Sequence, residues 1–171
     1  MSWACGASRI GITRRGMQKI AELYSRFSAN ITLVLKEGWQ FLPRNAFKLA
    51  SDTGFDDILM KVIDGQEHFI IMESKGGAGA LECIQGVGGQ GRVKQMSEPW
   101  VRDVLRRMKT HGKKDLADRI ETALDAGRVE GRICWTDISP TSTSTRQISY
   151  RFYGPNVPQA LKARYETASR W

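Results

Sequence analysis

The sequence FIIMESK, residues 69–75, joins an apolar run to a glutamate and a lysine. Because strand side chains alternate between two faces, Glu73 and Lys75 share one face with Phe69 and Ile71. A carboxylate and an amine then project together from the end of an apolar strand. Such a pair is either a salt bridge at the rim of a sheet or part of a reaction centre.

Two adjacent aspartates, Asp56 and Asp57, lie upstream in the sequence TGFDDILMKV. A hairpin turn is predicted at Asp64-Gly65, since Asp-Gly between two apolar runs is typical of a two-residue hairpin loop. The hairpin brings the start of its first strand beside the end of its second. We therefore expect Asp56 or Asp57 to approach residues 73–75.

This combination of residue types suits metal-assisted hydrolysis of a phosphodiester bond. Carboxylate oxygens are the ligands that Mg²⁺ prefers, and the ion usually keeps several waters. A bound Mg²⁺ or Mn²⁺ polarises a phosphoryl oxygen and lowers the pKa of a bound water. A lysine beside that water orients it, or helps to deprotonate it if the lysine pKa is lowered. The expected ligands are one of the two aspartates and Glu73, with Lys75 beside them.

The pattern of an aspartate, a spacer and Glu-x-Lys across a hairpin resembles the PD-(D/E)XK nuclease superfamily, to which many restriction enzymes belong. The downstream sequence KQMSEPWVRDVLRRM is similar to a segment in nuclease domains of bacterial polymorphic toxins and secretion-system effectors. In those domains a glutamine opens the helix behind the active strand and an aromatic residue follows. Gln95 and Trp100 match that arrangement. The specific part of the resemblance spans residues 54–108.

The resemblance implies a restriction-endonuclease-like core with Asp56 and Glu73 as metal ligands, Lys75 positioning the attacking water, and Gln95 supporting the site. Phe55 stands where the family motif has its proline. The Gly-x-Asp pattern of the family favours Asp56, and Asp57 remains an alternative ligand because the strand register is open. Many members carry a further acid on the first helix, for which Glu22 is the candidate here.

The same resemblance implies a DNase toxin domain of a secreted bacterial effector, delivered into the cytoplasm of a target cell. Its substrate is DNA, or alternatively RNA, and an acidic immunity protein is the expected protein partner. Two alternatives remain open. The chain is otherwise a cytoplasmic restriction or repair nuclease, or a catalytically inactive basic module that only binds nucleic acid.

The composition agrees with a basic, globular protein. The chain has 171 residues, a net charge of +8 and a pI near 9.7, and a positive excess suits nucleic acid or an acidic partner. Neither a membrane span nor a signal-peptide core is predicted. Three scattered cysteines, Cys5, Cys83 and Cys134, predict a reducing environment. Four cations are candidates for phosphate contacts, with a solvated helix face as the alternative: Arg92, Lys94, Arg102 and Arg106.

The elements that must position these residues are predicted as one α+β (mixed α/β) domain with a central mixed sheet flanked by helices. Residues 1–16 are expected to form a loose lead-in and residues 17–153 the core. The predicted helices are 17–27, one beginning at the Ser97 cap, Lys113–Ala126 and 158–169. The predicted strands are Phe55–Ile63, His68–Ser74, Val129–Thr136 and Arg146–Tyr153, with a further strand or buried turn at 31–38. The pattern leaves 39–50 ambiguous and predicts that the glycine-rich stretch 76–91 is too flexible to pack as an element.

Overall fold

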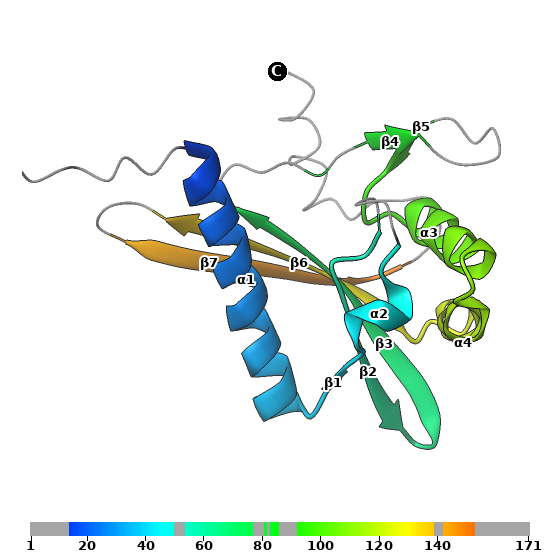
Figure 1. The fold of residues 1–171 in the computed structure, drawn as a ribbon. Coiled ribbons are helices and arrows are strands. Elements are labelled where there is room, and N and C mark those ends of the chain that lie inside the picture. The colour runs from blue at the N-terminus through cyan, green and yellow to red at the C-terminus, as the bar shows by residue number, and fades with distance from the viewer. Residues whose placement is uncertain are drawn as a thin grey trace, which may run out of the picture.

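A five-stranded mixed sheet organises the computed structural model, which describes residues 14–49, 54–76, 81, 83–85, 92–138 and 142–152. The strand order is β1-β2-β3-β6-β7; β3 and β6 run parallel and the other neighbours antiparallel. The helices lie against the sheet (Figure 1), which confirms the predicted α+β architecture with a mixed central sheet. The elements are α1 (Arg14–Glu37), β1 (Gln40–Phe41), α2 (Arg44–Phe47), β2 (Asp57–Ile63), β3 (Gln66–Gly76), β4 (Cys83–Gln85), β5 (Arg92–Lys94), α3 (Glu98–Thr110), α4 (Lys114–Asp125), β6 (Val129–Ile138) and β7 (Thr143–Arg151).

The predicted hairpin is present as β2 and β3. Asp64 and Gly65 form its turn with φ values of 51° and 74°, a left-handed conformation that asparagine, aspartate and glycine tolerate best. Asp57 pairs with Met72 across the two strands. The start of β2 therefore lies beside the end of β3, as the Asp-Gly turn predicted.

The two faces of β3 belong to different cores. Phe69 and Ile71 pack in the larger cluster with side chains of α3 and α4. Ile70 and Met72 pack in a smaller cluster with Leu33 of α1. The predicted alternation is confirmed, and α1 covers one face of the sheet while α3 and α4 cover the other (Figure 1).

Helix α1 is longer than predicted at both ends. It begins at Arg14, inside the segment expected to be a loose lead-in, and it continues through residues 31–37, for which a strand or buried turn was wrongly predicted. The β-branched residues Ile31 and Thr32 suggested a strand, but helical burial continues to Leu33, which is fully buried on the sheet. Packing of that face outweighs local strand propensity, and the helix stops before Gly38.

The glycine-rich stretch 76–91 was expected to contain no packed element, and this prediction is wrong. Gly76 ends β3, and β4 pairs antiparallel with β5 in a separate two-stranded sheet. Backbone pairing between β4 and β5 holds this part of the stretch in a strand, and the sequence pattern did not indicate that pairing. The ambiguous region 39–50 contains the short elements β1 and α2.

Helices α3 and α4 confirm their predicted caps. The Ser97 side chain accepts a hydrogen bond from the backbone N–H of Trp100, and proline lies in the first turn of α3. Helix α4 ends at Asp125, with Ala126 as its C-cap and Gly127 after it at a φ of 68°. Strands β6 and β7 match their predicted segments with shifted ends. Residues 1–13, Tyr153 and the predicted helix 158–169 lie outside the described residues.

Candidate active site

Glu73 is a buried carboxylate at the end of β3, with a relative exposure of 3%. Its Oε1 accepts hydrogen bonds from Lys75 Nζ at 2.7 Å and from Gln95 Nε2 at 2.6 Å. Its Oε2 is also buried but has no hydrogen-bond partner among the described residues. Burial, followed by the negative charge of Asp56, raises the pKa of Glu73 to about 8. The site thus holds a carboxyl group with one unsatisfied oxygen.

Asp56 is the aspartate that approaches Glu73. Its Oδ2 accepts a hydrogen bond of 2.9 Å from the backbone N–H of Ser74. Its own backbone carbonyl accepts a bond of 3.1 Å from Arg44 Nη2. The Asp56 side chain is therefore fixed beside the end of β3, and its charge acts on the pKa of Glu73.

Asp57 has a different environment from its neighbour. It is 2% exposed, and both of its carboxylate oxygens accept hydrogen bonds from the guanidinium of Arg26 on α1. Arg44 Nε lies 3.8 Å from Asp57 Oδ1. A carboxylate held in a two-pronged arginine pair is already compensated. Of the two candidate ligands, the structure brings Asp56 towards Glu73 and directs Asp57 towards Arg26.

Helix α1 brings Glu22 to the same end of the sheet. Burial is the largest cause that raises the pKa of Glu22, and the charge of Asp56 is the second; Lys75 opposes both. Gly76 makes this approach possible, since a Cβ at this position would lie 2.1 Å from the backbone oxygen of Gln18 on α1. The glycine directly after Lys75 thus lets the helix backbone contact the strand.

Gln95 reaches Glu73 from a tight turn between β5 and α3. The next residue, Met96, has a φ of 64°, a conformation that non-glycine residues rarely adopt. Met96 is fully buried, and its carbonyl accepts a hydrogen bond of 2.6 Å from the hydroxyl of Tyr150. Packing and this bond hold the turn that directs the amide of Gln95 to the carboxyl group.

A pocket of about 330 Å³ opens at Glu22 and Asp56, and the described residues Glu73, Lys75 and Gln95 are not part of its lining. Glu22 and Asp56 line it together with three cations. The full lining is Lys19, Glu22, Leu23, Arg26, Arg44, Asp56 and Ser74. Sequence reasoning did not find Lys19, Arg26 or Arg44. No motif marks them, because they lie on α1 and α2 and reach the site only through the packing of these elements.

Two of the four cations proposed for phosphate contacts form ion pairs within the protein. Arg102 bonds to Glu98 at 2.9 Å and to Asp125 at 2.7 Å, and Arg106 contacts Asp103 at 3.3 Å. Lys94 is exposed on β5, and the side chain of Arg92 lies outside the described part of the chain. Their role in binding nucleic acid stays a prediction. Trp100 is 1% exposed and packs in the larger core cluster.

Asp56 and Glu73 are the two carboxylates proposed by the sequence as ligands of a divalent cation. Within the described residues, no group of three or more His, Cys, Asp or Glu side chains is arranged to hold a metal. Asp56 and Glu73 nevertheless supply two carboxylates, and Glu73 Oε2 lacks a hydrogen bond. Mg²⁺ is commonly held by one or two carboxylates, with water and substrate phosphate completing its shell.

Comparisons of this chain with protein-family models, with curated proteins and with solved structures find no match. In the part of the chain that the structure describes, no helix has the length and apolar character needed to cross a membrane.

Cys134 is a free, buried cysteine, and burial raises its pKa to about 12. Cys5 and the side chain of Cys83 lie outside the described residues.

Proposed function

We propose that this chain is a Mg²⁺- or Mn²⁺-dependent nuclease with a restriction-endonuclease-like core, which hydrolyses phosphodiester bonds at the end of the β2–β3 hairpin. The observation that carries the proposal is the unsatisfied, buried Oε2 of Glu73, close to a second carboxylate and to an amine. A buried polar atom without a partner costs about 1–3 kcal/mol unless a ligand satisfies it. A structural salt bridge gains nothing from such an atom.

Asp56 and Glu73 would hold the cation, which when bound supplies Lewis acidity at the phosphoryl oxygen and a more acidic water. Lys75 donates to Glu73 Oε1 at 2.7 Å, and in the proposed reaction its ammonium would orient the attacking water. Gln95 donates to the same oxygen, so Glu73 has a fixed orientation. The raised pKa of Glu73 means that a cation must compete with a proton. We expect the affinity for Mn²⁺ to increase as the pH rises towards 8, by at most about tenfold per pH unit.

The charge of the protein supports a polyanionic substrate. The net charge is +8 over 171 residues, and three cations line the pocket that contains Asp56. Lysine and arginine supply most of the affinity of proteins for phosphate backbones. We propose DNA as the substrate and keep RNA as the second arm of the test.

The similarity of residues 94–108 to toxin nucleases supports a further part of the proposal. As a toxin domain delivered to another cell, the nuclease requires an immunity protein in the cell that makes it. An acidic surface would suit this partner, because opposite charges accelerate association. Expression in a bacterial host without a protective partner should kill the host if wild-type protein is made. Survival, while purified protein still cuts DNA, would favour the restriction or repair alternative.

The decisive experiment is cleavage of plasmid DNA and of a mixed-sequence RNA by the purified chain. We expect cleavage with Mg²⁺ or Mn²⁺, none with EDTA, and a loss of at least about a thousandfold in Glu73→Gln. The matched control is Glu67→Gln, since Glu67 lies on the same strand but bonds to Arg119. It should cut at the wild-type rate. Intact nucleic acid in all arms, or equal cutting by Glu73→Gln, would contradict the proposal.

A second pair of variants separates the two aspartates. Asp56→Asn should abolish cleavage and weaken Mn²⁺ binding measured by calorimetry. Asp57→Asn should lower thermal stability, because it leaves the guanidinium of Arg26 without its carboxylate, but cleavage per folded molecule should persist. The reverse outcome would transfer the ligand role from Asp56 to Asp57.

A further inference from the structure

A row of large apolar side chains on α1 faces solvent. The small or buried residues of the helix, such as Ala21 and Leu33, lie against the sheet instead. The exposed row comprises Ile20, Leu23, Tyr24, Phe27, Ile31 and Leu35. Contiguous exposed apolar patches on a protein surface commonly mark interaction sites.

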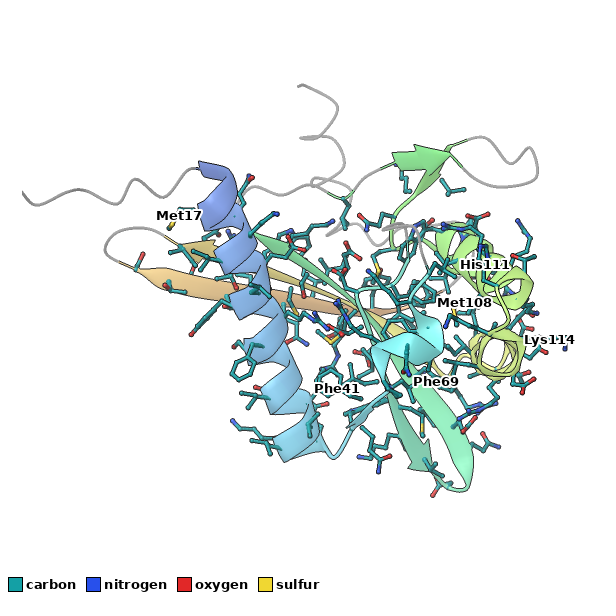
Figure 2. The ribbon with its side chains drawn as sticks, viewed as in Figure 1. Met17, Phe41, Phe69, Met108, His111 and Lys114 are labelled. Carbon is teal, nitrogen blue, oxygen red and sulfur yellow. The ribbon has the colours of Figure 1, made fainter. Side chains whose placement is uncertain are left out.

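Part of this row lines a pocket of about 450 Å³ between α1 and the edge of the sheet. Leu23, Phe27 and Ile31 come from the helix, and Phe41 and Leu42 come from β1 and the residue after it. Figure 2 shows Phe41 beside α1. Phe27 and Phe41 are 68% and 42% exposed, so their rings are available to a ligand. The size suits a small organic group.

The apolar pocket adjoins the candidate active site. It shares Leu23, Arg26 and Arg44 with the smaller pocket that contains Glu22 and Asp56. Arg44 is 46% exposed and donates a hydrogen bond to the carbonyl of Asp56. Two arginines and the buried carboxylate of Asp57, which both arginines contact, line the polar side of the apolar pocket. A molecule that binds here would therefore have its apolar part beside two phenylalanines and its phosphate beside the exposed Arg44.

We propose that this pocket binds an unstacked nucleobase of the substrate strand next to the phosphodiester to be cut, so that single-stranded or locally opened nucleic acid is preferred. The inference rests on the proposed nuclease function. A base within a duplex is stacked and paired, and it cannot enter a side pocket without being extruded. Aromatic rings with neighbouring cations are the usual platform for unpaired bases.

Charge and position favour this occupant over a protein helix. A helix packed along α1 would cover the whole apolar row, including Leu35, which does not line the pocket. The pocket instead extends from the row towards Phe41 and Arg44, and it shares Arg44 with the smaller pocket that Asp56 lines. A nucleotide matches this combination of an apolar floor and cationic edge, because it joins a flat ring to a phosphate.

The test measures binding in EDTA, where metal-dependent cleavage does not occur, by fluorescence anisotropy of labelled 12-nucleotide DNA. The probes are a single strand of mixed sequence, the same strand with one abasic site moved along it, and the corresponding duplex. We expect wild-type protein to bind the intact strand about tenfold more tightly than the strand with the abasic site at one position. Phe41→Ala and Phe27→Ala should lose about tenfold in affinity and should no longer distinguish the abasic strand.

Leu35→Ala is the matched control, since it truncates an apolar residue of the same exposed row outside the pocket. It should bind all probes as the wild type does. Thermal unfolding of each variant checks that these exposed truncations leave the fold intact. The inference is overturned if wild-type protein ignores the abasic site at every position, if the phenylalanine variants keep their discrimination, or if Leu35→Ala weakens binding equally. The last result would show that the exposed row as a whole, and not the pocket, contacts the DNA.

The outcomes of this experiment and of the cleavage assay are independent. Metal-dependent cleavage by a protein that ignores the abasic site leaves the nuclease in place and rejects the base pocket. If the wild type binds the intact strand more tightly than the abasic strand but cleaves no nucleic acid, base binding is supported. The nuclease proposal is then rejected in favour of a nucleic-acid-binding module.

Discussion

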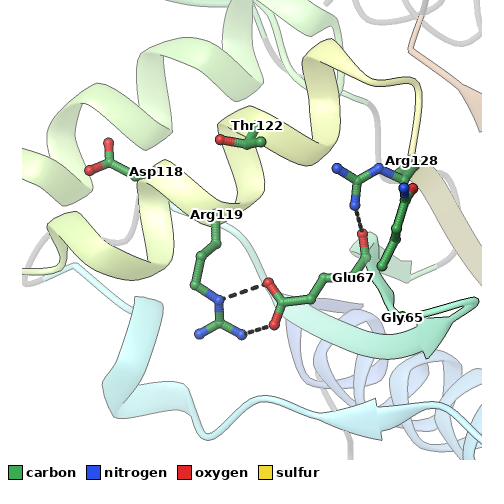
Figure 3. Close-up of a pocket in the computed structure, with 7 residues that line it drawn as sticks. Gly65, Glu67, Asp118, Arg119, Thr122 and Arg128 are labelled. Atoms are coloured by element: carbon green, nitrogen blue, oxygen red, sulfur yellow. Dashed lines mark hydrogen bonds and ion pairs between the residues drawn. The ribbon is translucent and has the colours of Figure 1, made fainter.

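Glu67 and Glu73 occupy the same face of β3, one near the hairpin turn and the other at the opposite end of the strand. Glu67 is partly exposed and pairs with both arms of Arg119 through its carboxylate, while Arg128 donates to its backbone carbonyl (Figure 3). The hydrogen bond from Arg119 lowers the pKa of Glu67. Glu73 is buried, has one unsatisfied oxygen, and has its pKa raised to about 8.

The two glutamates differ in what surrounds their carboxylates, although they lie on one strand. Around Glu67, solvent and a planar guanidinium satisfy both oxygens, so the carboxylate is stable as an anion. Around Glu73, the strand has entered the interior and a second carboxylate lies close by, so the anion is disfavoured until a cation compensates it. The first pair stabilises the carboxylate of Glu67 as an anion, and the end of the strand at Glu73 is the one that we propose binds a cation.

Among the comparisons between the two ends of β3, the largest expected effect comes from replacing the basic side chain that bonds to each glutamate. Lys75→Met should reduce metal-dependent cleavage by about 10²–10⁴-fold, the usual contribution of a group that orients or deprotonates the attacking water. Arg119→Met, the equivalent loss at the Glu67 end, should leave the rate unchanged. Initial rates on plasmid DNA, corrected for the folded fraction, provide the measurement. Similar losses in both variants would remove the distinction between the two ends.

The pH dependence of stability should have opposite signs at the two glutamates. The pKa of Glu73 is raised from 4.5 to about 8 in the folded protein, so its contribution to stability is fully present below about pH 4.5 and is lost as the pH rises through 8. Relative to Glu73→Gln, the wild type should lose up to about 1.4 kcal/mol in the free energy of unfolding for each pH unit in this window.

At Glu67 the sign is reversed. Its pKa is lowered in the fold, so its stabilising contribution is present above the unfolded value of 4.5 and is lost as the pH falls through the folded value. Urea unfolding of wild type, Glu73→Gln and Glu67→Gln between pH 3 and 9 tests both signs, without metal. Parallel curves for wild type and Glu73→Gln above pH 5 would contradict the raised pKa of Glu73.

Removal of the Gln95 amide should increase the difference in pKa between Glu73 and Glu67, and this effect is smaller than those above. The side chain donates to Glu73 Oε1 at 2.6 Å, and this bond favours the anion. Gln95→Ala should therefore raise the pKa of Glu73 further, by an amount equivalent to about 1 kcal/mol. Titration of the Glu73 carboxyl carbon by NMR measures the change. A pKa that falls in Gln95→Ala would mean that the amide does not stabilise the anion.

The smallest effect is expected for the exposed pair itself. Arg119→Ala should cost about 0–1 kcal/mol in the free energy of unfolding, because exposed salt bridges contribute little in water. The loss should shrink further in high salt, where surface charges are screened. Urea titrations at low and high ionic strength provide the measurement. A cost well above that range, independent of salt, would show that Arg119 supports the fold through packing instead.

The local signals in the sequence determined most of the elements around the site. The Asp64-Gly65 turn fixed the hairpin, and the alternation of apolar residues placed Glu73 and Lys75 on one face of β3. Ser97 predicted the start of α3 through its hydroxyl cap. These features depend on residues a few positions apart, whose conformations and periodicity are visible in the sequence itself.

Only the tertiary structure decided which face of α1 is buried, that Asp57 pairs with Arg26, and that Asp56 lies by Glu73. The sequence of α1 contains a large apolar row that would be expected to pack inside, but the close contact at Gly76 brings a face with small residues to the sheet. Burial, pKa and pairing arise from segments that are distant in the chain. Their energies belong to the packed assembly, so no local pattern can specify them.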